Sequence, residues 1–356
     1  QDGRLYNAAL LLDGGEISAM RFKYDLPNYG VFDEKRVFAA GPLPGPVNFR
    51  GVRLGVMICE DMWTEEVAEC LEESGAEILT VLNGSPYEQD KWDTRLNLAV
   101  ARATECRMPL IYVNQVGGQD ELVFDGASFV LGADASLRAQ APAWVENVTV
   151  TAWTRDGDGW VCAETDRHPP PDGDPAIYSA MVLGLRDYVR KSGFPGVIIG
   201  MSGGIDSALT AAVAADALGP DRVHCVMMPS PYTSQESLDD AAEASALLGV
   251  RLDSISIGPA MAAFDDMLAE AFAGSDADTT EENIQARSRG LTLMALSNKT
   301  GAMVVSTGNK SEMSVGYATL YGDMCGGYSV LKDVYKTKVF ELSHWRNRNL
   351  PDGALG

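Results

Sequence analysis

The hexapeptide Ser202-Gly203-Gly204-Ile205-Asp206-Ser207 follows an apolar run over 196–201 and precedes a segment with the pattern of a helix. Adjacent glycines let backbone N–H groups approach an anion, and a helix that begins near Ile205 adds partial positive charge there. This arrangement predicts a cradle for pyrophosphate, an ordinary strand-turn-helix corner being the alternative. Because the Walker lysine is absent, attack at an α-phosphate is favoured over cleavage between β- and γ-phosphates. Asp206 beside a polyphosphate requires a cation, for which Mg²⁺ is suited.

A cysteine occupies a comparable corner in the first half of the chain. Residues 52–58 have the pattern of a buried strand, Cys59 follows directly, and 64–66 open a helix. Such a position exposes the sulfur, offers backbone N–H groups to an oxyanion, and favours the thiolate. From these residues alone, a buried structural cysteine is the simpler interpretation.

The elements around Cys59 follow a βαβαβ rhythm. Apolar runs with the composition of buried strands occupy 52–58, 77–82 and 109–113. Helical patterns separate them, at about 62–74 and 91–107. Shorter segments bounded by turn formers predict antiparallel strands at 127–131, 136–140, 147–153 and 160–163. We expect two layers of strands with outer helices.

Strands and helices alternate strictly in the second half of the chain. The predicted strands are 196–201, 222–228, 251–257 and 302–306, and the predicted helices are about 176–191, 205–218, 234–248 and 281–298. This pattern predicts a doubly wound parallel sheet whose ligand lies at the carboxyl ends of the strands, where Ser202 and Thr307 follow. A proline-rich linker at 167–175 separates the predicted domains, 1–166 and 176–356.

Composition limits the class of protein. The 356 residues carry a net charge of −22, which argues against nucleic acid and anionic membranes as partners because both require a basic footprint. The early apolar run at 8–12 is too short for a signal sequence or a membrane span, so a cytoplasmic location is expected. Six cysteines without C-x-x-C spacing indicate neither a disulfide framework nor a zinc site. We also expect a homo-oligomer.

The second half contains three strings that together resemble a known family. The hexapeptide resembles the PP-loop of adenylate-forming ATP pyrophosphatases, and the stretches 281–290 and 306–323 resemble NAD synthetases. The resemblance implies that the nicotinate carboxylate of deamido-NAD attacks the α-phosphate of ATP and that ammonia then displaces AMP. It places ATP on Gly200, Met201, Ser202, Gly203, Gly204, Ile205, Asp206, Ser207, Thr307 and Lys336. It places deamido-NAD on Asn283, Arg287 and Glu312, and Mg²⁺ on Asp206 and Glu312, with the metal role favoured for Glu312.

The first half resembles the nitrilase, or carbon-nitrogen hydrolase, superfamily, as found in glutamine-dependent NAD synthetases. The resemblance rests on the stretches 23–34 and 83–87 and on Lys91. It implies an α-β-β-α sandwich in which Cys59 forms a thioester with glutamine and Lys23 stabilises the oxyanion. Tyr29, Ser85 and Lys91 would bind glutamine by the same resemblance.

The glutamate base of that superfamily has no match in this sequence. It belongs well upstream of the lysine, whereas only 22 residues precede Lys23, and Glu16 is too close and lies in a predicted turn. The expectation is therefore a fragment that lacks its first strands, or a glutaminase that is inactive as written. The synthetase half is likewise expected to be incomplete at its C-terminus.

Three functions compete at this point. The favoured one is glutamine-dependent NAD synthesis, in which ammonia from the first domain amidates adenylated deamido-NAD in the second. A nitrilase-type amidase with a regulatory nucleotide-binding domain is the second, and it would leave 281–287 and 307–312 without a role. The third is a truncated, non-catalytic nucleotide-binding scaffold.

Overall fold

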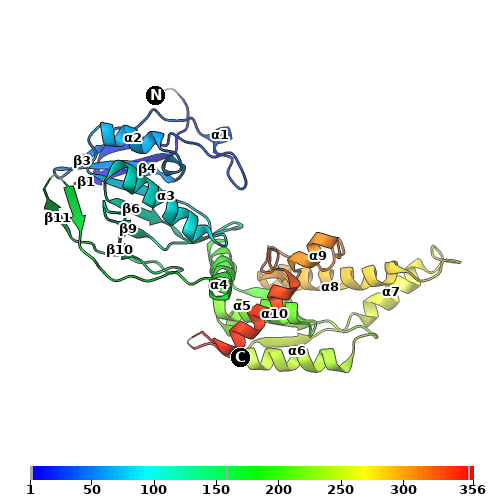
Figure 1. Ribbon diagram of the computed structural model, residues 1–356. Helices are drawn as coiled ribbons and strands as arrows, with labels where there is room; N and C mark the ends of the chain where they lie inside the picture. Colours follow the sequence, from blue (N-terminus) through cyan, green and yellow to red (C-terminus); the bar gives the residue numbers. More distant parts are fainter. Residues whose placement is uncertain (1–2, 158, 352) are drawn as a thin grey trace. The chain divides into compact units, whose positions relative to one another are not determined.

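The computed structural model describes residues 3–157, 159–351 and 353–356. The chain divides into two compact units (Figure 1). The first comprises Gln1–Gly117 and Leu122–Asp172, and the second comprises Gly118–Glu121 and Gly173–Gly356. The division after Asp172 falls inside the predicted linker.

A six-stranded mixed sheet forms the centre of the first unit, in the order β10-β9-β6-β5-β4-β3. Its strands are β3 (Val47–Phe49), β4 (Val52–Ile58), β5 (Ile78–Asn83), β6 (Leu110–Asn114), β9 (Phe129–Leu131) and β10 (Leu137–Gln140). The three runs predicted as buried strands form β4, β5 and β6, which are mutually parallel. The other strands join antiparallel at the edges.

Helices α2 (Glu66–Glu73) and α3 (Lys91–Cys106) cover one face of this sheet. Their apolar residues, among them Leu71 and Ala103, pack on Leu79 and Leu110 of the strands in one continuous core. The predicted helices over 62–74 and 91–107 are therefore confirmed in type. The first begins later than expected, because 59–62 form a separate 3₁₀ turn.

Three antiparallel hairpins and a short helix complete the first half of the chain. The hairpins are β1 (Ala8–Asp13) with β2 (Glu16–Phe22), β7 (Val116–Gln119) with β8 (Leu122–Asp125), and β11 (Trp153–Asp156) with β12 (Gly159–Cys162). The short helix is α1 (Glu34–Val37). Glu16 opens β2 rather than lying in the turn, which Gly14 and Gly15 form alone with positive φ.

The strand predicted at 147–153 is wrong over most of its length. Only Trp153 belongs to a strand, β11, while 147–152 have no regular structure. Val148 and Val150 are 90% and 85% exposed. Their alternation resembles a strand in sequence, but no backbone within the described residues pairs with them.

The second unit is built on a five-stranded parallel sheet in the order β15-β14-β13-β16-β17. The strands are β13 (Val197–Gly200), β14 (Val223–Met227), β15 (Arg251–Ser254), β16 (Met303–Ser306) and β17 (Tyr328–Ser329). The chain moves outward from β13 to β15 and then returns to β16 on the other side of β13. The predicted doubly wound parallel sheet is confirmed, and its strand order reverses between β13 and β16.

Helices lie on both faces of this sheet. Four pack in one core with alternate strand residues such as Ile199 and Val305: α4 (Asp174–Lys191), α5 (Ile205–Leu218), α6 (Gln235–Leu248) and α10 (Lys336–Arg348). The opposite strand faces, including Ile198 and Val304, pack with α7 (Gly258–Leu268) and α8 (Thr279–Thr300). A short helix, α9 (Lys310–Val315), follows β16.

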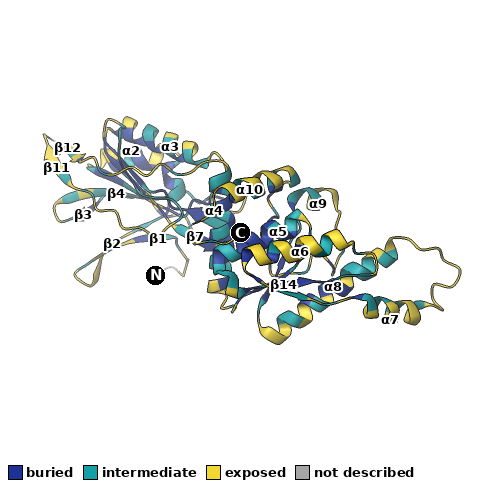
Figure 2. Cartoon of the chain, turned by 90° about the horizontal axis from the view of Figure 1, so that it is seen from below, coloured by how far each residue is buried: buried dark blue, intermediate teal, exposed yellow. Residues whose placement is uncertain are grey.

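The burial colours agree with this layering. In Figure 2 the central strands are dark blue and the outer side of α6 is yellow. Helix α5, predicted at 205–218, has those bounds because its largely apolar sequence packs on the sheet. In the described part of the chain, no helix is both long and apolar enough to cross a membrane.

Candidate functional site

Cys59 lies at the corner between β4 and the 3₁₀ turn η1 (Cys59–Met62). Its φ of 51° is in the left-handed region, which is costly for a residue with a Cβ and is often found at functional corners. The carboxylate of Asp61 fixes this corner by accepting the N–H groups of Tyr24, Asp25 and Ile58 at 2.8–3.0 Å. The predicted corner is confirmed, and Asp61 ties it to the residues that follow Lys23.

Lys23 is buried beside this corner and has a carboxylate partner. Its side chain is 1% exposed, and Nζ donates to both carboxylate oxygens of Glu34, at 2.8 and 2.9 Å. Glu34 belongs to α1 and had no predicted role. A buried ammonium requires such a partner, since an unpaired charge in this position would be strongly destabilised.

The electrostatics of Cys59 differ from the sequence expectation. Burial raises the pKa of the Cys59 thiol, and the positive charge of Lys23 and the Gly84 N–H only partly oppose that effect. Glu60 and Glu34 raise the pKa further. The thiolate is therefore disfavoured in the isolated protein, whereas the corner position alone predicted the opposite.

The three residues predicted to bind glutamine occupy different parts of the first unit. Tyr29 is half exposed and its hydroxyl donates to Oε1 of Glu60 at 2.6 Å, immediately beside Cys59. Ser85 is buried and follows Gly84, whose backbone N–H lowers the pKa of the Cys59 thiol. Lys91 opens α3, with Nζ 3.3 Å from Glu88 and 5.5 Å from the centre of the Trp63 ring. Glu60 had no predicted role, because the prediction for this corner rested on Cys59 alone.

A cavity of about 490 Å³ opens in the second unit where the strand order reverses. Its wall includes Gly200, the last residue of β13, with Met201 and Ser202 after it, and Ser306 and Thr307 at the end of β16. Helix α8 contributes Ala286, Arg289, Gly290 and Leu293. Ser202 and Thr307 follow the carboxyl ends of β13 and β16, as predicted, and this is the edge at which a doubly wound sheet binds its ligand.

Hydrogen bonds of Ser207 with Ser202 and Gly204 stabilise the turn of the glycine-rich hexapeptide. Ser207 Oγ accepts the N–H of Ser202 at 3.2 Å and donates to the carbonyl of Gly204 at 2.8 Å. Gly203 has a φ of +83°, and a Cβ there would lie 2.4 Å from the carbonyl oxygen of Ser237. Only glycine fits this position, and the resulting turn begins α5 at Ile205.

Asp206 lies in a polar cluster on the first turn of α5. Its carboxylate forms an ion pair with Lys336 and accepts the side-chain N–H of Asn309 at 3.0 Å. The backbone N–H of Asn309 donates to Glu312 Oε2, also at 3.0 Å. Asn309 thus joins the two carboxylates that were predicted to bind Mg²⁺.

This donor set fits a magnesium ion held in part by phosphate. Among the described residues, no group of three or more His, Cys, Asp or Glu side chains could hold a metal. Mg²⁺, however, is commonly bound by one or two carboxylates together with substrate phosphates. Asp206 and Glu312 match that requirement.

Asn283 and Arg287 lie on α8 but not on the wall of the cavity. Asn283 accepts a hydrogen bond from Thr319 at 2.9 Å, and Arg287 donates to the carbonyl of Leu320 at 3.2 Å. Both residues therefore hold the segment after α9. Arg289 was missed, although the helical spacing of 286, 289, 290 and 293 places it on the cavity side. It donates to the carbonyl of Met228 at 3.1 Å, and burial lowers its pKa.

Each half of the chain matches a known protein family. The carbon-nitrogen hydrolase family matches residues 1–157, and the NAD synthase family matches residues 177–354. The glutamine-dependent NAD(+) synthetase of Rhodobacter capsulatus is 53% identical over 96% of this chain, and that of Acinetobacter baylyi is 46% identical over 98%. The chain spans 62% and 64% of the length of these relatives.

A solved structure is similar to this chain over nearly its whole length. It is the glutamine-dependent NAD+ synthetase from Acinetobacter baumannii in complex with adenosine diphosphate, with a TM-score of 0.92 and 47% identity over 98% of this chain and 66% of that one. The relative from Aquifex aeolicus is 39% identical, and the chain covers 67% of it. These matches confirm the predicted fold class, nitrilase-like followed by a parallel-sheet synthetase domain. The chain belongs to the family of glutamine-dependent NAD(+) synthetases.

Proposed function

We propose that this chain catalyses glutamine-dependent synthesis of NAD⁺ from deamido-NAD. The observation that carries the proposal is the presence, in one chain, of a cysteine corner with a buried lysine and a phosphate cradle without a Walker lysine. The first arrangement suits amide cleavage, and the second suits release of pyrophosphate. The family relationship supports their combination.

In the first unit, Cys59 acts as the nucleophile toward the side-chain amide of glutamine. Its sulfur adds to the amide carbon, the C–N bond breaks as ammonia leaves, and water hydrolyses the resulting thioester to glutamate. The Lys23 ammonium stabilises the negative charge that develops on the carbonyl oxygen. Tyr29, Ser85 and Lys91 hold the substrate, with Tyr29 fixed by Glu60.

The rise in the pKa of Cys59 has a role in this scheme. Without substrate the thiol keeps its proton, so a group in the site must take the proton when glutamine binds. Glu34 is a carboxylate that contacts Lys23 and acts electrostatically on Cys59. Its negative charge raises the pKa of the Cys59 thiol and so opposes the effect of Lys23.

In the second unit, the nicotinate carboxylate attacks the α-phosphate of ATP and pyrophosphate leaves. Ammonia then attacks the acyl adenylate and AMP leaves. Residues 200–207 and Thr307 bind ATP, with residues 200–202 and Thr307 on the cavity wall, and Lys336 exchanges Asp206 for a phosphate. The adenosine diphosphate bound by the relative from Acinetobacter baumannii supports an adenine nucleotide here.

Mg²⁺ and deamido-NAD complete the proposed site. Mg²⁺ held by Asp206 and Glu312 would neutralise phosphate oxygens as pyrophosphate departs. Asn283 and Arg287 would contact deamido-NAD at the segment after α9. In the structure, Asn283 is hydrogen bonded to Thr319 of this segment, and Arg287 to the carbonyl of Leu320.

A cytoplasmic homo-oligomer is part of the same proposal. Exposed apolar side chains gather after α9, including Tyr317 at 75% and Tyr321 at 82%. Such a concentration of apolar surface is typical of contacts between subunits. Measurement of the mass in solution tests this point.

The decisive experiment supplies the full chain with glutamine, ATP, deamido-NAD and Mg²⁺ and quantifies all products. NAD⁺, AMP and pyrophosphate should form in equal amounts. Formation of ADP and phosphate would reject chemistry at the α-phosphate. Hydrolysis of glutamine without NAD⁺, even when ammonium is added, would favour the amidase with a regulatory nucleotide domain.

A further inference from the structure

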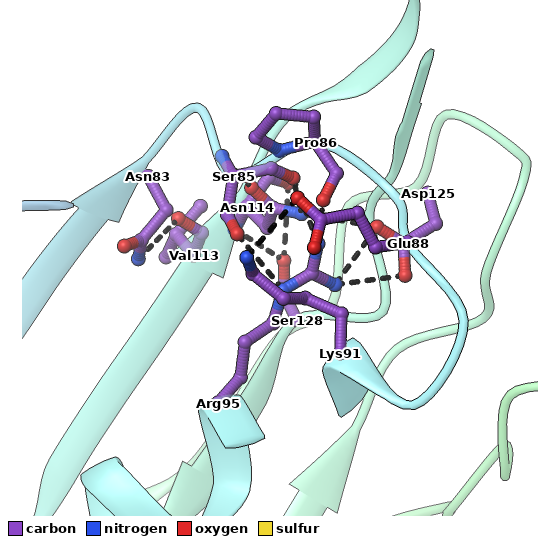
Figure 3. A network of polar contacts seen from close by, with 10 residues as sticks. All are labelled: Asn83, Ser85, Pro86, Glu88, Lys91, Arg95, Val113, Asn114, Asp125 and Ser128. Carbon is purple, nitrogen blue, oxygen red and sulfur yellow. Dashed lines mark hydrogen bonds and ion pairs between the residues drawn. The ribbon is translucent and has the colours of Figure 1, made fainter. Parts of the chain in front are cut away.

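Arg95 of α3 lies in a buried polar network (Figure 3). One member of the network, Ser85, directly follows Gly84, whose backbone N–H acts on Cys59. The side chain of Arg95 is 2% exposed, and its three nitrogen atoms all donate hydrogen bonds. Nη1 lies 2.8 Å from both carboxylate oxygens of Asp125, and Nη2 lies 2.8 and 2.9 Å from the carbonyl oxygens of Ser85 and Pro86. Nε donates to Ser85 Oγ at 3.0 Å.

The same network fixes Ser85 from a second side. The N–H of Ser85 donates to Asn114 Oδ1 at 2.9 Å, and Asn114 Nδ2 donates back to the carbonyl of Ser85 at 3.2 Å. Ser85 therefore has a partner for its amide, its carbonyl and its hydroxyl. Figure 3 shows the side chains of Arg95 and Asn114 pointing toward Ser85 and Pro86.

Gly84 lies between two anchored residues, and its own amide faces Cys59. Before it, the carbonyl of Asn83 accepts the N–H of Gln115 at 3.0 Å. After it, Ser85 is held by Arg95 and Asn114. The backbone N–H of Gly84 acts on Cys59 and lowers the pKa of its thiol. The direction of this amide thus depends on the network around Ser85.

Stability alone gives a weak reason for this arrangement. A buried ion pair stabilises a fold little more than apolar side chains of similar volume would, because both charges lose their hydration. Arg95 instead directs three of its hydrogen bonds at two residues adjoining the cysteine corner. A planar guanidinium can hold several acceptors in a fixed geometry, which an ammonium cannot.

We propose that Arg95, oriented by Asp125, is a positioning residue that fixes the segment 84–86 so that the Gly84 amide faces Cys59 and Ser85 stands ready for the substrate. The part concerning Ser85 rests on the proposed glutamine chemistry. The part concerning Gly84 and Cys59 does not. No substrate contact is assigned to Arg95 itself.

The test compares two buried arginines on the same helix. Arg95→Lys retains the charge but loses the planar fork. Arg102→Lys is the matched control, because Arg102 is 6% exposed and its side chain pairs with Glu105 rather than with the segment 84–86. Thermal melting of both full-length variants reports the cost to the fold.

Two readouts separate positioning from stability. The first is the rate of alkylation of Cys59 by iodoacetamide as a function of pH, followed by mass spectrometry of the Cys59 peptide. The second is kcat and KM for glutamine hydrolysis. The charged and titratable groups that act on Cys59, namely Lys23, Glu34, Glu60, Tyr29 and Tyr112, are unchanged in these variants.

Arg95→Lys should move the alkylation midpoint to higher pH, since a displaced Gly84 amide no longer stabilises the thiolate. Its kcat/KM for glutamine should fall by about tenfold or more, mainly through kcat, as expected for loss of charge-assisted hydrogen bonds. Arg102→Lys should melt at lower temperature yet keep the midpoint and both kinetic constants.

A folded Arg95→Lys protein with an unchanged midpoint and kinetic constants within about twofold of the wild type would overturn the proposal. Equal effects in Arg102→Lys would do the same. If Arg95→Lys fails to fold, Asp125→Asn is measured instead, with the same shifts expected. A wild-type protein that shows no glutamine hydrolysis would reject the proposed function, while the alkylation midpoint would still decide the role of Arg95.

Discussion

The ammonium of Lys23 lies 2.8 Å from Oε1 of Glu34, inside the first unit and beside the corner that carries Cys59. The lysine is 1% exposed, so its charge acts on the sulfur with little screening by water. The pair as a whole is close to neutral. The pair favours the Cys59 thiolate only if the lysine lowers the pKa of the thiol by more than the glutamate raises it. The lysine does have the larger effect.

Lys23→Met should raise the pKa of the Cys59 thiol above its already elevated value. A nearby positive charge favours the thiolate, so its removal favours the protonated form, and alkylation at a fixed pH should slow. The measurement is the pH dependence of iodoacetamide incorporation at Cys59. Lys35→Met, which changes an exposed lysine of α1, is the control and should leave the profile unchanged.

Selectivity among the cysteines follows from the same physics. Burial raises the pKa of Cys106 to about 11 and that of Cys225 to about 12. Neither thiol should react with iodoacetamide at neutral pH in the folded protein. Labelling of either at a rate equal to that of Cys59 would contradict the description of the Cys59 corner.

Cys59→Ala should separate the two proposed activities. Synthesis of NAD⁺ with glutamine as nitrogen donor should be abolished, because the nucleophile is lost. Synthesis with ammonium should persist, since the cavity proposed to bind the nucleotide lies in the second unit. The assay measures NAD⁺ with each donor, and retained glutamine-supported synthesis would show that Cys59 is not the nucleophile.

Local patterns were sufficient to predict most of the elements of the second unit. Helix α5 has the predicted bounds because its apolar residues are continuous and glycines stand at both ends. Strands β13 and β16 are short apolar runs that only a central position in a sheet can bury. Because β13 and β16 pair in parallel, Ser202 and Thr307 follow them at a common edge of the sheet.

Long-range polar contacts could not be predicted in this way. Lys336 reaches Asp206 across 130 positions, and Arg95 reaches Asp125 across 30. Neither pair has a periodic signal, because each depends on the spatial packing of separate elements. Glu34 lies only 11 positions from Lys23 but was missed, since the chain between them is irregular and gives no helical or strand spacing.

The buried pair Arg346–Asp216 should be the most sensitive ion pair of the second unit. Its side chains are 4% and 3% exposed, and Tyr178 donates to the same carboxylate. Asp216→Asn leaves the arginine buried without a charged partner, so the free energy of unfolding should fall by about 3–5 kcal/mol.

Hydrogen exchange of the amides in β13, buried in the same core, measures that loss. Glu341→Gln is the control on α10, because Glu341 is 55% exposed in its pair with Lys338. Its change should stay within about 0.5 kcal/mol. Equal losses in the two variants would show that burial of the pair has no special weight.

Asp206→Asn should impair adenylate formation with both nitrogen donors, in contrast to Cys59→Ala. The carboxylate is held by Lys336 and Asn309 when no nucleotide is present, and it is proposed to exchange the lysine for Mg²⁺ when ATP binds. Loss of its charge should raise the Mg²⁺ concentration needed for half-maximal pyrophosphate release by about tenfold or more, as expected for a contact between charged groups. Pyrophosphate release is followed at fixed ATP while Mg²⁺ is varied.

The control is Asp221→Asn, which changes an exposed aspartate of the turn after α5 and should leave the Mg²⁺ dependence unchanged. An unaltered Mg²⁺ dependence in both Asp206→Asn and Glu312→Gln would mean that the metal is held by other groups and that the ion pair of Asp206 with Lys336 serves only the fold.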